Sequence, residues 1–182
     1  RYLQSLAGAG RSLRERTDHA GSGEVRVVHI ETRNTDGRPI GAVACGQDFD
    51  LFLHFEARPG TAAAGIIPSV SLRTQLNVPV FMHHSRLTRR QFDRLPERGA
   101  FVLRISRLPL PPAAYRLGYS LMPDMGRTNK YIDALPDAAE LSVVEGDFYN
   151  SGEVPPVSHG LVLVEGDWRL ESSPPPAGTE TP

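Results

Sequence analysis

The stretch GAFVLRISRLPLPPAAYRLGYSLM, residues 99–122, decides the fold of this chain. Its first part alternates apolar Phe101, Leu103 and Ile105 with side chains that point the other way, which is the period of a half-buried β-strand. The run LPLPP at 108–112 follows, and so many prolines cannot pair in the interior of a sheet. The chain therefore crosses an end of the fold at this point.

A second strand follows the crossing and has two distinct faces. One face carries Tyr115, Leu117, Tyr119 and Leu121, and the other carries Arg116, Gly118, Ser120 and Met122. A tyrosine a few residues beyond such a crossing is typical of a tyrosine corner, in which the hydroxyl returns to the backbone upstream. Two amphipathic strands joined by a long crossing predict a sandwich of two sheets.

Composition narrows the class of protein. A chain of 182 residues predicts one domain with tails, and a formal net charge of -1 gives no global field that favours nucleic acid or an anionic membrane. The single cysteine, Cys45, excludes an intrachain disulfide and suits a reducing compartment. No apolar run approaches the roughly 20 residues of a membrane helix. The chain begins at Arg1, so we expect a fragment of a longer protein.

Turn signals separate further short strands on both sides of the central pair. We expect these strands at residues 25–32, 40–45, 49–55, 66–73, 78–84, 140–144 and 161–164. Residues 88–91, TRRQ, fit a capping box and predict a short helical turn. The pattern as a whole predicts an all-β fold, an immunoglobulin-like antiparallel β-sandwich.

Composition also sets the expected domain boundaries. Residues 1–22 turn glycine-rich and charged, which predicts a flexible linker that buries little. Residues 23–170 form the sandwich domain, and 171–182, ending in SSPPPAGTETP, are expected to be disordered.

The order of these features resembles that of a known family. The series is GSGEVRV, then TDGRPI, then RISRLPLPPAAYRLGYSL, then YIDALPDAAELSVVEGDFYNSG, and last GLVLVEGDW. It resembles the C-terminal carbohydrate-binding domain of the Wzt-type ATPase subunit of bacterial O-antigen polysaccharide ABC transporters, over roughly residues 23–170.

The resemblance implies an immunoglobulin-like sandwich whose concave sheet binds the terminus of an undecaprenol-linked glycan at the cytoplasmic face of the inner membrane. The implied partners are the O-antigen polysaccharide, a second copy in a homodimer, an upstream ATPase domain and a membrane-spanning transporter subunit. Residues 1–22 would be the tether from that ATPase domain, which this chain lacks. A C-terminal strand exchanged in the dimer would supply the interface residues Leu161, Leu163 and Trp168.

Catalytic and metal chemistry find little support in the residues. The adjacent His83 and His84 face opposite ways on a strand, so a regular strand cannot bring both to one metal. No GxSxG motif is present, and the carboxylate pairs at 93/97 and 133/137 lie in turn-like surroundings typical of surface acids. Cys45 has no basic neighbour in sequence and is interpreted as a packing residue. We therefore expect no cofactor, no metal and no enzyme activity, and any ATPase activity would lie in the absent half of the parent protein.

Sugar binding needs planar polar groups beside an apolar surface, and the non-core face of one sheet offers such a set. The candidates are Ser69, Ser71, Arg73, His83, Arg116, Ser120, Tyr131 and Asp133. Gly118 in mid-strand would permit close approach of a ligand. The alternative is that these residues are only the solvated face of an antiparallel sheet.

Three functions follow from this pattern and from what the family resemblance implies. The first is a non-catalytic domain that recognises the end of an O-antigen chain and couples this recognition to export. The second is a dimerisation or docking module without its own ligand. The third, an enzyme acting on glycans, has the weakest basis because no acid–base pair can be argued.

Overall fold

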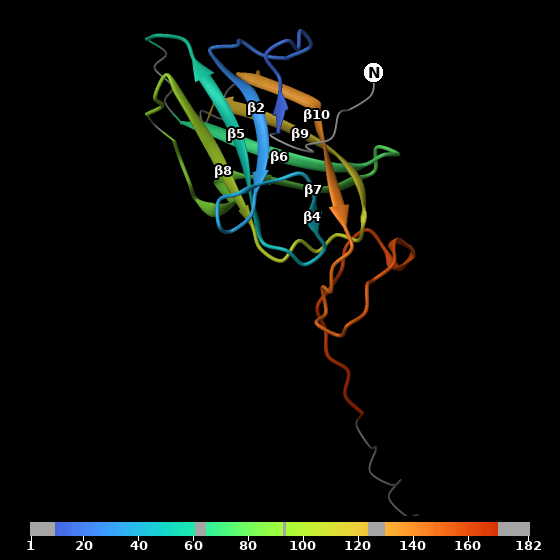
Figure 1. The fold of residues 1–182 in the computed structure, drawn as a ribbon. Coiled ribbons are helices and arrows are strands. Elements are labelled where there is room, and N and C mark those ends of the chain that lie inside the picture. Colours follow the sequence, from blue (N-terminus) through green and yellow to red (C-terminus); the bar gives the residue numbers. More distant parts are fainter. Residues whose placement is uncertain (1–9, 61–64, 93, 124–129, 171–182) are drawn as a thin grey trace, which may run out of the picture.

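The computed structural model describes residues 10–60, 65–92, 94–123 and 130–170 and forms two facing β-sheets (Figure 1). The first, here called the β5 sheet, has the order β1 (Arg11–Ser12), β2 (Val25–Arg33), β5 (Phe49–Ala57) and β8 (Arg98–Ile105), with β3 (Pro39–Ile40) also on β2. The second, the β9 sheet, has the order β4 (Val43–Ala44), β10 (Asp133–Val144), β9 (Ala113–Pro123), β6 (Ile66–Thr74) and β7 (Pro79–His84). The predicted all-β sandwich is confirmed.

One detail of the predicted sandwich needs correction. Residues 40–45 form no single strand, because β3 pairs antiparallel with β2 whereas β4 pairs parallel with β10 in the other sheet. The chain changes sheets through the bend at 41–42, so the β9 sheet is mixed rather than purely antiparallel.

The core lies between the two inner faces and follows the predicted alternation. The buried side chains from the β5 sheet include Val27, Ile30, Leu51, Leu53, Phe55 and Phe101, and those from the β9 sheet include Val70, Leu72, Leu117, Tyr119, Leu121, Leu135 and Leu141. Burial of such side chains removes apolar surface from water, at about 25 cal/mol per Å². This is the main force that holds the sheets together.

The proline-rich run crosses from β8 in one sheet to β9 in the other, as the sequence predicts. Leu108 and Leu110 are buried, and the backbone of Leu108 exchanges hydrogen bonds with Gly46 and Gln47. The hydroxyl of Tyr115 donates to the carbonyl oxygen of Pro111 at 2.9 Å, which confirms the tyrosine corner.

The N-terminal segment differs from the expected linker over its described residues, 10–22. The Leu13 side chain is 0% exposed, and Leu13 N–H donates to the carbonyl of Val28 on β2 at 2.8 Å. Further along, Ala20 N–H donates to the carbonyl of Ala134 on β10 at 3.0 Å. The segment therefore bridges the two sheets. Residues 1–9 and 171–182, the rest of the predicted tails, lie outside the described residues.

The predicted helical turn forms earlier in the chain. A 3₁₀ turn, η1, spans Ser85–Thr88, and Arg89 follows with a φ of 54° in the left-handed region. The backbone leaves the helical region at Arg89, so the turn cannot continue over 88–91. Within the described part of the chain, no helix is long and apolar enough to cross a bilayer.

After β10 the chain forms an irregular loop at one end of the sandwich, and residues 164–170 run away from the body (Figure 1). The strand predicted at 161–164 is not formed; the segment has one 3₁₀ turn, η2 (Val157–His159). Leu163 is buried, and its N–H donates to the carbonyl of Pro109 at 2.8 Å. A strand requires a neighbouring ladder of backbone groups, and here a single hydrogen bond to a proline-rich loop takes its place.

Candidate functional site

The outer face of the β9 sheet gathers most of the polar residues that the sequence singled out. Directly opposed residues of antiparallel strands point to the same side of the sheet. Ser69 is opposite Ser120 on β9 and His84 on β7, while Arg73 is opposite Arg116. We call the resulting surface the outer polar face; it comprises Ser69, Ser71, Arg73, Met82, His84, Arg116, Ser120 and Met122.

Small side chains form the middle of the outer polar face. The hydroxyls of Ser69 and Ser120 are hydrogen-bonded to each other at 2.5 Å. Ser71 is opposite Gly118 on one side and Met82 on the other, and Met82 is 63% exposed. Hydroxyl groups thus lie beside an exposed thioether, a combination of polar and apolar surface that suits a sugar ring.

Two polar atoms of the outer polar face keep an unfilled hydrogen-bonding position. Arg116 forms an ion pair through one terminal nitrogen with Asp137, but its Nε is buried and has no hydrogen-bond partner within the described residues. The Nδ1 atom of His84 is likewise buried and has no hydrogen-bond partner within the described residues. A buried polar atom without a partner costs about 1–3 kcal/mol, so both atoms favour an external partner such as water or a ligand hydroxyl.

Asp133, one of the predicted sugar-binding residues, lies in the interior instead. It is opposite Leu121, whose side chain is in the core, so the register directs Asp133 inward. Its carboxylate oxygens accept hydrogen bonds from Val27 N–H at 2.8 Å and the Tyr119 hydroxyl at 2.7 Å, and lie 2.7 Å from Nδ1 of His19. Burial and the neighbouring carboxylate raise the pKa of Tyr119, so the phenol keeps its proton and donates.

His83 also faces away from the outer polar face. It is opposite Val70, a core residue, so its side chain points between the sheets at the edge of β7. The pattern of residues predicted His83 for the polar face, and only the register with β6 distinguishes it from His84. His84 therefore takes its place on the outer polar face.

Tyr131 and Gly118 need separate comment. Tyr131 is 44% exposed and lies two residues before β10, outside the strand rows that define the outer polar face. A Cβ atom on Gly118 would lie 2.4 Å from the carbonyl oxygen of Pro136. The glycine therefore accommodates the bulge of β10 between Leu135 and Ala139, and not the approach of a ligand.

The outer face of the β5 sheet is polar too, but its charges are paired across the strands. Arg104 forms a two-pronged ion pair with Asp50 and thereby lowers the pKa of that carboxyl. Glu31 binds His54 at 2.8 Å and also pairs with Arg33. This face has the character of a solvated surface with satisfied charges.

Metal-binding clusters and reactive thiolates are two kinds of catalytic group. No group of three His, Cys, Asp or Glu side chains that could hold a metal ion exists among the described residues. Cys45 is buried, and burial raises the pKa of its thiol, so the reactive thiolate is disfavoured. This agrees with its interpretation as a packing residue.

The three residues expected at a dimer interface differ in exposure. Trp168 is fully exposed on the extended C-terminal segment and Leu161 is half exposed, whereas Leu163 is buried against the chain itself. Large apolar side chains such as that of Trp168 are seldom fully exposed to water.

Comparison with known proteins gives two informative matches. The family model described as the Wzt C-terminal domain matches residues 16–163. The crystal structure of the C-terminal domain of Wzt matches with a TM-score of 0.68 at 12% identity, covering 93% of this chain and 98% of that chain. At that identity the likeness shows the same fold.

Another solved structure, the CARDB domain of a Pyrococcus furiosus protein, has a TM-score of 0.37 at 11% identity and covers 79% of this chain and 100% of that chain. This value is too low to carry an argument. No curated protein matches the chain.

Proposed function

The chain belongs to the Wzt C-terminal domain family, and we propose that it is a non-catalytic module that binds the terminus of an O-antigen polysaccharide. In the parent protein this module would couple recognition to export by an ABC transporter. An upstream ATPase domain and a membrane-spanning subunit would be its partners at the cytoplasmic face of the inner membrane.

The observation that carries the proposal is the unfilled hydrogen-bonding capacity of the outer polar face. Arg116 Nε and His84 Nδ1 are buried without a partner among the described residues; Arg116 is on the same strand as Ser120, and His84 is opposite Ser69, which is hydrogen-bonded to Ser120. A sugar hydroxyl both donates and accepts, so different hydroxyls of a glycan could pair with a donor such as Arg116 Nε and with His84 Nδ1. The exposed Met82 offers apolar surface for the C–H face of a ring.

A binding role fits this face better than glycan hydrolysis does. Hydrolysis needs two carboxyl groups at a fixed separation, one of which must be protonated. Asp137 is held in an ion pair by Arg116, and Glu140 accepts a hydrogen bond from Gln75 at 3.1 Å. Both carboxylates thus act as partners of neighbouring side chains.

A dimerisation role is the second candidate, and the C-terminal segment favours it. Trp168 and Leu170 are fully exposed, and Val164 is largely so. In a homodimer these side chains would pack on the partner, and the segment from Leu161 to Trp168 would form the exchanged strand that the family resemblance implies. Deleting residues 158–182 should then yield monomers in sedimentation experiments.

The decisive experiment is a calorimetric titration of the intact protein with the purified O-antigen polysaccharide of its source. Arg116→Ala should weaken binding about tenfold or more, because a hydrogen bond to a charged group is lost. Arg104→Ala is the matched control, since it removes an ion-paired arginine from the outer face of the other sheet; its affinity should stay within about twofold of the wild type.

Equal affinities for Arg116→Ala and the wild type would refute the assignment of the site. No heat of binding from a folded dimer would refute carbohydrate recognition and leave the docking role.

A further inference from the structure

The bulge in β10 leaves part of the backbone without a strand partner. Leu135 is opposite Tyr119 and Ala139 is opposite Leu117, so residues 136–138 of β10 face the single residue Gly118 of β9. On its other side β10 pairs with β4, but only further along, at residues 143–144. Backbone groups of the bulge therefore need hydrogen-bond partners from outside the two ladders.

The N-terminal segment supplies such a partner. The Nη1 group of Arg16 donates to the carbonyl oxygen of Asp137 at 3.1 Å. The Nε and Nη2 groups donate to the two carboxylate oxygens of Asp18, each at 2.7 Å. This two-pronged pair fixes the plane of the guanidinium, and only 17% of the Arg16 side chain is exposed. The hydrogen bond from Ala20 to Ala134 fastens the same segment to β10 a few residues before the bulge.

The side chain of Asp137 connects the bulge to the outer polar face. Its carboxylate forms an ion pair with a terminal nitrogen of Arg116, the residue on which the proposed glycan site depends. The Arg116 side chain is 25% exposed, so part of it reaches solvent on that face. Asp137 is thus held at its carbonyl oxygen by Arg16 and at its carboxylate by Arg116.

The orientation of Arg116 is not dictated by its own strand pairing. The residue directly opposite Arg116 on β10 is Glu140, and directly opposed side chains are the nearest neighbours across two strands. Arg116 nevertheless pairs with Asp137, while Glu140 accepts a hydrogen bond from Gln75 at 3.1 Å. Two carboxylates of one strand therefore compete for one guanidinium, and the position of the bulge decides between them.

We propose that Arg16 is a positioning residue for the outer polar face: it fixes the bulge of β10, and the bulge holds Arg116 on Asp137 in the orientation that binds the glycan. Without Arg16 the bulge relaxes, and Arg116 turns toward Glu140. The inference rests on the proposed function, because its consequence is an affinity for the glycan. It adds a contribution from a segment that has no residue on the outer polar face itself.

The first test is a double-mutant cycle, measured by calorimetric titration of the intact protein with the purified O-antigen polysaccharide of its source. Arg16→Gln should weaken binding about threefold or more. The double variant, Arg16→Gln with Arg116→Ala, should bind no more weakly than Arg116→Ala alone, because the effect of Arg16 passes through Arg116. A merely structural role would weaken both backgrounds alike, and the two losses would multiply.

Arg14→Gln is the matched control. Arg14 lies two residues earlier in the same segment, and it forms a two-pronged ion pair with Glu56 of β5 instead of a contact with β10. Its loss removes the same charge from the same segment and should leave the affinity within about twofold of the wild type.

The second test needs no ligand. In the nitrogen-15-labelled protein, the Arg116 Nε–H group is buried, so its exchange with solvent reports how firmly the side chain is held. Arg16→Gln should speed this exchange and move the Arg116 resonance, whereas Arg14→Gln should do neither. Asp137→Asn breaks the same link from its other end and should also speed the exchange; its side chain is 33% exposed, so it serves where Arg16→Gln fails to fold.

The two tests separate the two claims. If the wild-type protein gives no heat of binding with the polysaccharide, the proposed function fails, and the Arg116 Nε–H exchange still decides the positioning role. Exchange like that of the wild type in Arg16→Gln or in Asp137→Asn would overturn that role. Multiplied losses of affinity in the double variant would overturn it as well.

Discussion

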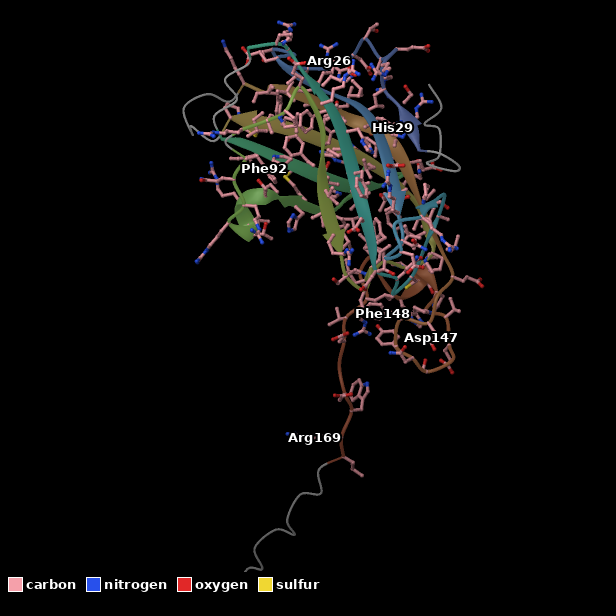
Figure 2. The ribbon with its side chains drawn as sticks, turned by 60° about the vertical axis from the view of Figure 1, so that its left-hand side comes forward. Arg26, His29, Phe92, Asp147, Phe148 and Arg169 are labelled. Atoms are coloured by element: carbon pink, nitrogen blue, oxygen red, sulfur yellow. The ribbon has the colours of Figure 1, made fainter. Side chains whose placement is uncertain are left out.

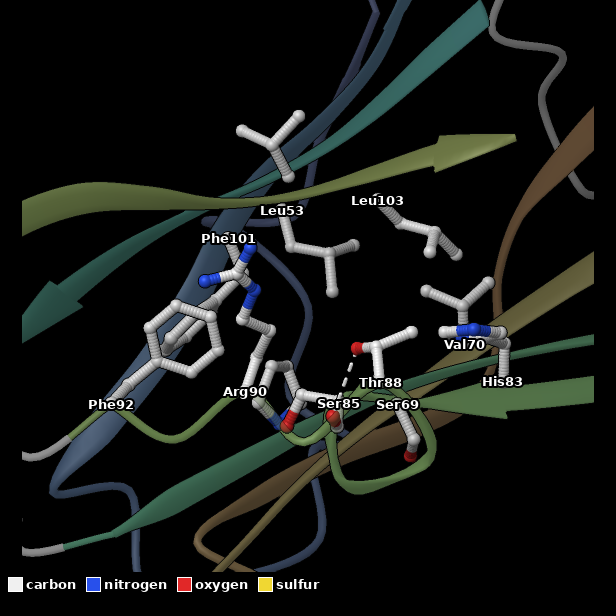
Figure 3. Close-up of a pocket in the computed structure, with 12 residues that line it drawn as sticks. Leu53, Ser69, Val70, His83, Ser85, Thr88, Arg90, Phe92, Phe101 and Leu103 are labelled. Carbon is white, nitrogen blue, oxygen red and sulfur yellow. Dashed lines mark hydrogen bonds between the residues drawn. The ribbon is translucent and has the colours of Figure 1, made fainter. Parts of the chain in front are cut away.

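The two long sides of this sandwich are built in contrasting ways. On one side, where β2 and β10 adjoin, residues 10–23 run across the gap and hydrogen-bond to both strands; we call it the closed edge. On the other side, between β7 and β8, lies a small cavity lined by Val70, Phe92 and Phe101 (Figure 3); we call this side the open edge. Figure 2 shows His29 of β2 and Phe92 of the open edge on opposite sides of the molecule.

The difference lies in what each segment contributes to the interior. At the closed edge the chain inserts Leu13 and His19, and His19 joins Asp133 and Tyr119 in a buried hydrogen-bonded network. At the open edge the chain inserts Phe92 and leaves its arginines in solvent. A satisfied polar network makes an edge specific and rigid, whereas a single aromatic contact leaves room beside it.

The largest effect is expected from Asp133→Ala, which breaks the network of the closed edge. Val27 N–H and the Tyr119 hydroxyl would lose their acceptor while still buried, at about 3–5 kcal/mol in the free energy of unfolding. Urea unfolding followed by circular dichroism measures this. A loss below about 1 kcal/mol would mean that water replaces the carboxylate, and the closed edge would then be less rigid than the comparison requires.

Leu13→Ala should have the next largest effect, about 2–4 kcal/mol, because it removes a fully buried side chain and leaves a cavity. Leu76→Ala is the matched control, since Leu76 is 89% exposed; it should change stability by less than about 0.5 kcal/mol. Similar values for the two variants would show that the N-terminal segment does not stabilise the sandwich.

At the open edge, Phe92→Ala should cost only about 1–2 kcal/mol. The ring is half-buried and contacts Phe101 from one side, so less apolar surface returns to water than in a full core truncation. The same unfolding experiment applies. A loss as large as that of Leu13→Ala would remove the contrast between the edges.

The smallest effect concerns pH and Glu31, on β2 beside the closed edge. Burial alone would raise the pKa of Glu31, but hydrogen bonds from His54 and Arg33 outweigh it and hold the pKa below its ordinary value of 4.5. A carboxyl with a lowered pKa stabilises the folded state above its ordinary pKa and loses that contribution as the pH falls through the folded value. Stability should therefore decline as the pH falls below about 5.

Glu31→Gln should flatten that acid decline and leave the curve above pH 7 with the same shape. Asp36→Asn is the control, because Asp36 lies in an exposed turn with its backbone N–H bound to Asn34. An unchanged acid slope in Glu31→Gln would assign the decline to other carboxylates.

The features of this fold that depend on the alternation of side chains along a strand, or on residues close in sequence, were predictable from the sequence. Alternation placed Leu117 and Tyr119 inside and Arg116 and Ser120 outside, because a strand turns successive side chains to opposite faces. The tyrosine corner was predictable because the proline run and Tyr115 are close in sequence.

The closed edge was not predictable, because its contacts join residues far apart in the chain. Leu13 is a single apolar residue in a polar segment, and no pattern in the neighbouring sequence indicates that its side chain enters the core. Asp133 and His83 were misplaced for a related reason: a strand's register is set by its neighbours, and a shift of one residue reverses every side chain. Both assignments required the pairings with β9 and β6.

The bridge between the sheets also has a mechanical consequence. Residue 13 is fastened to β2, and residues 20 and 23 are fastened to the β10 side through Ala134 and Ile132. A force applied to the chain at its N-terminal end is therefore transmitted to both sheets. Such a force would rotate the two sheets together and would not separate one sheet from the other.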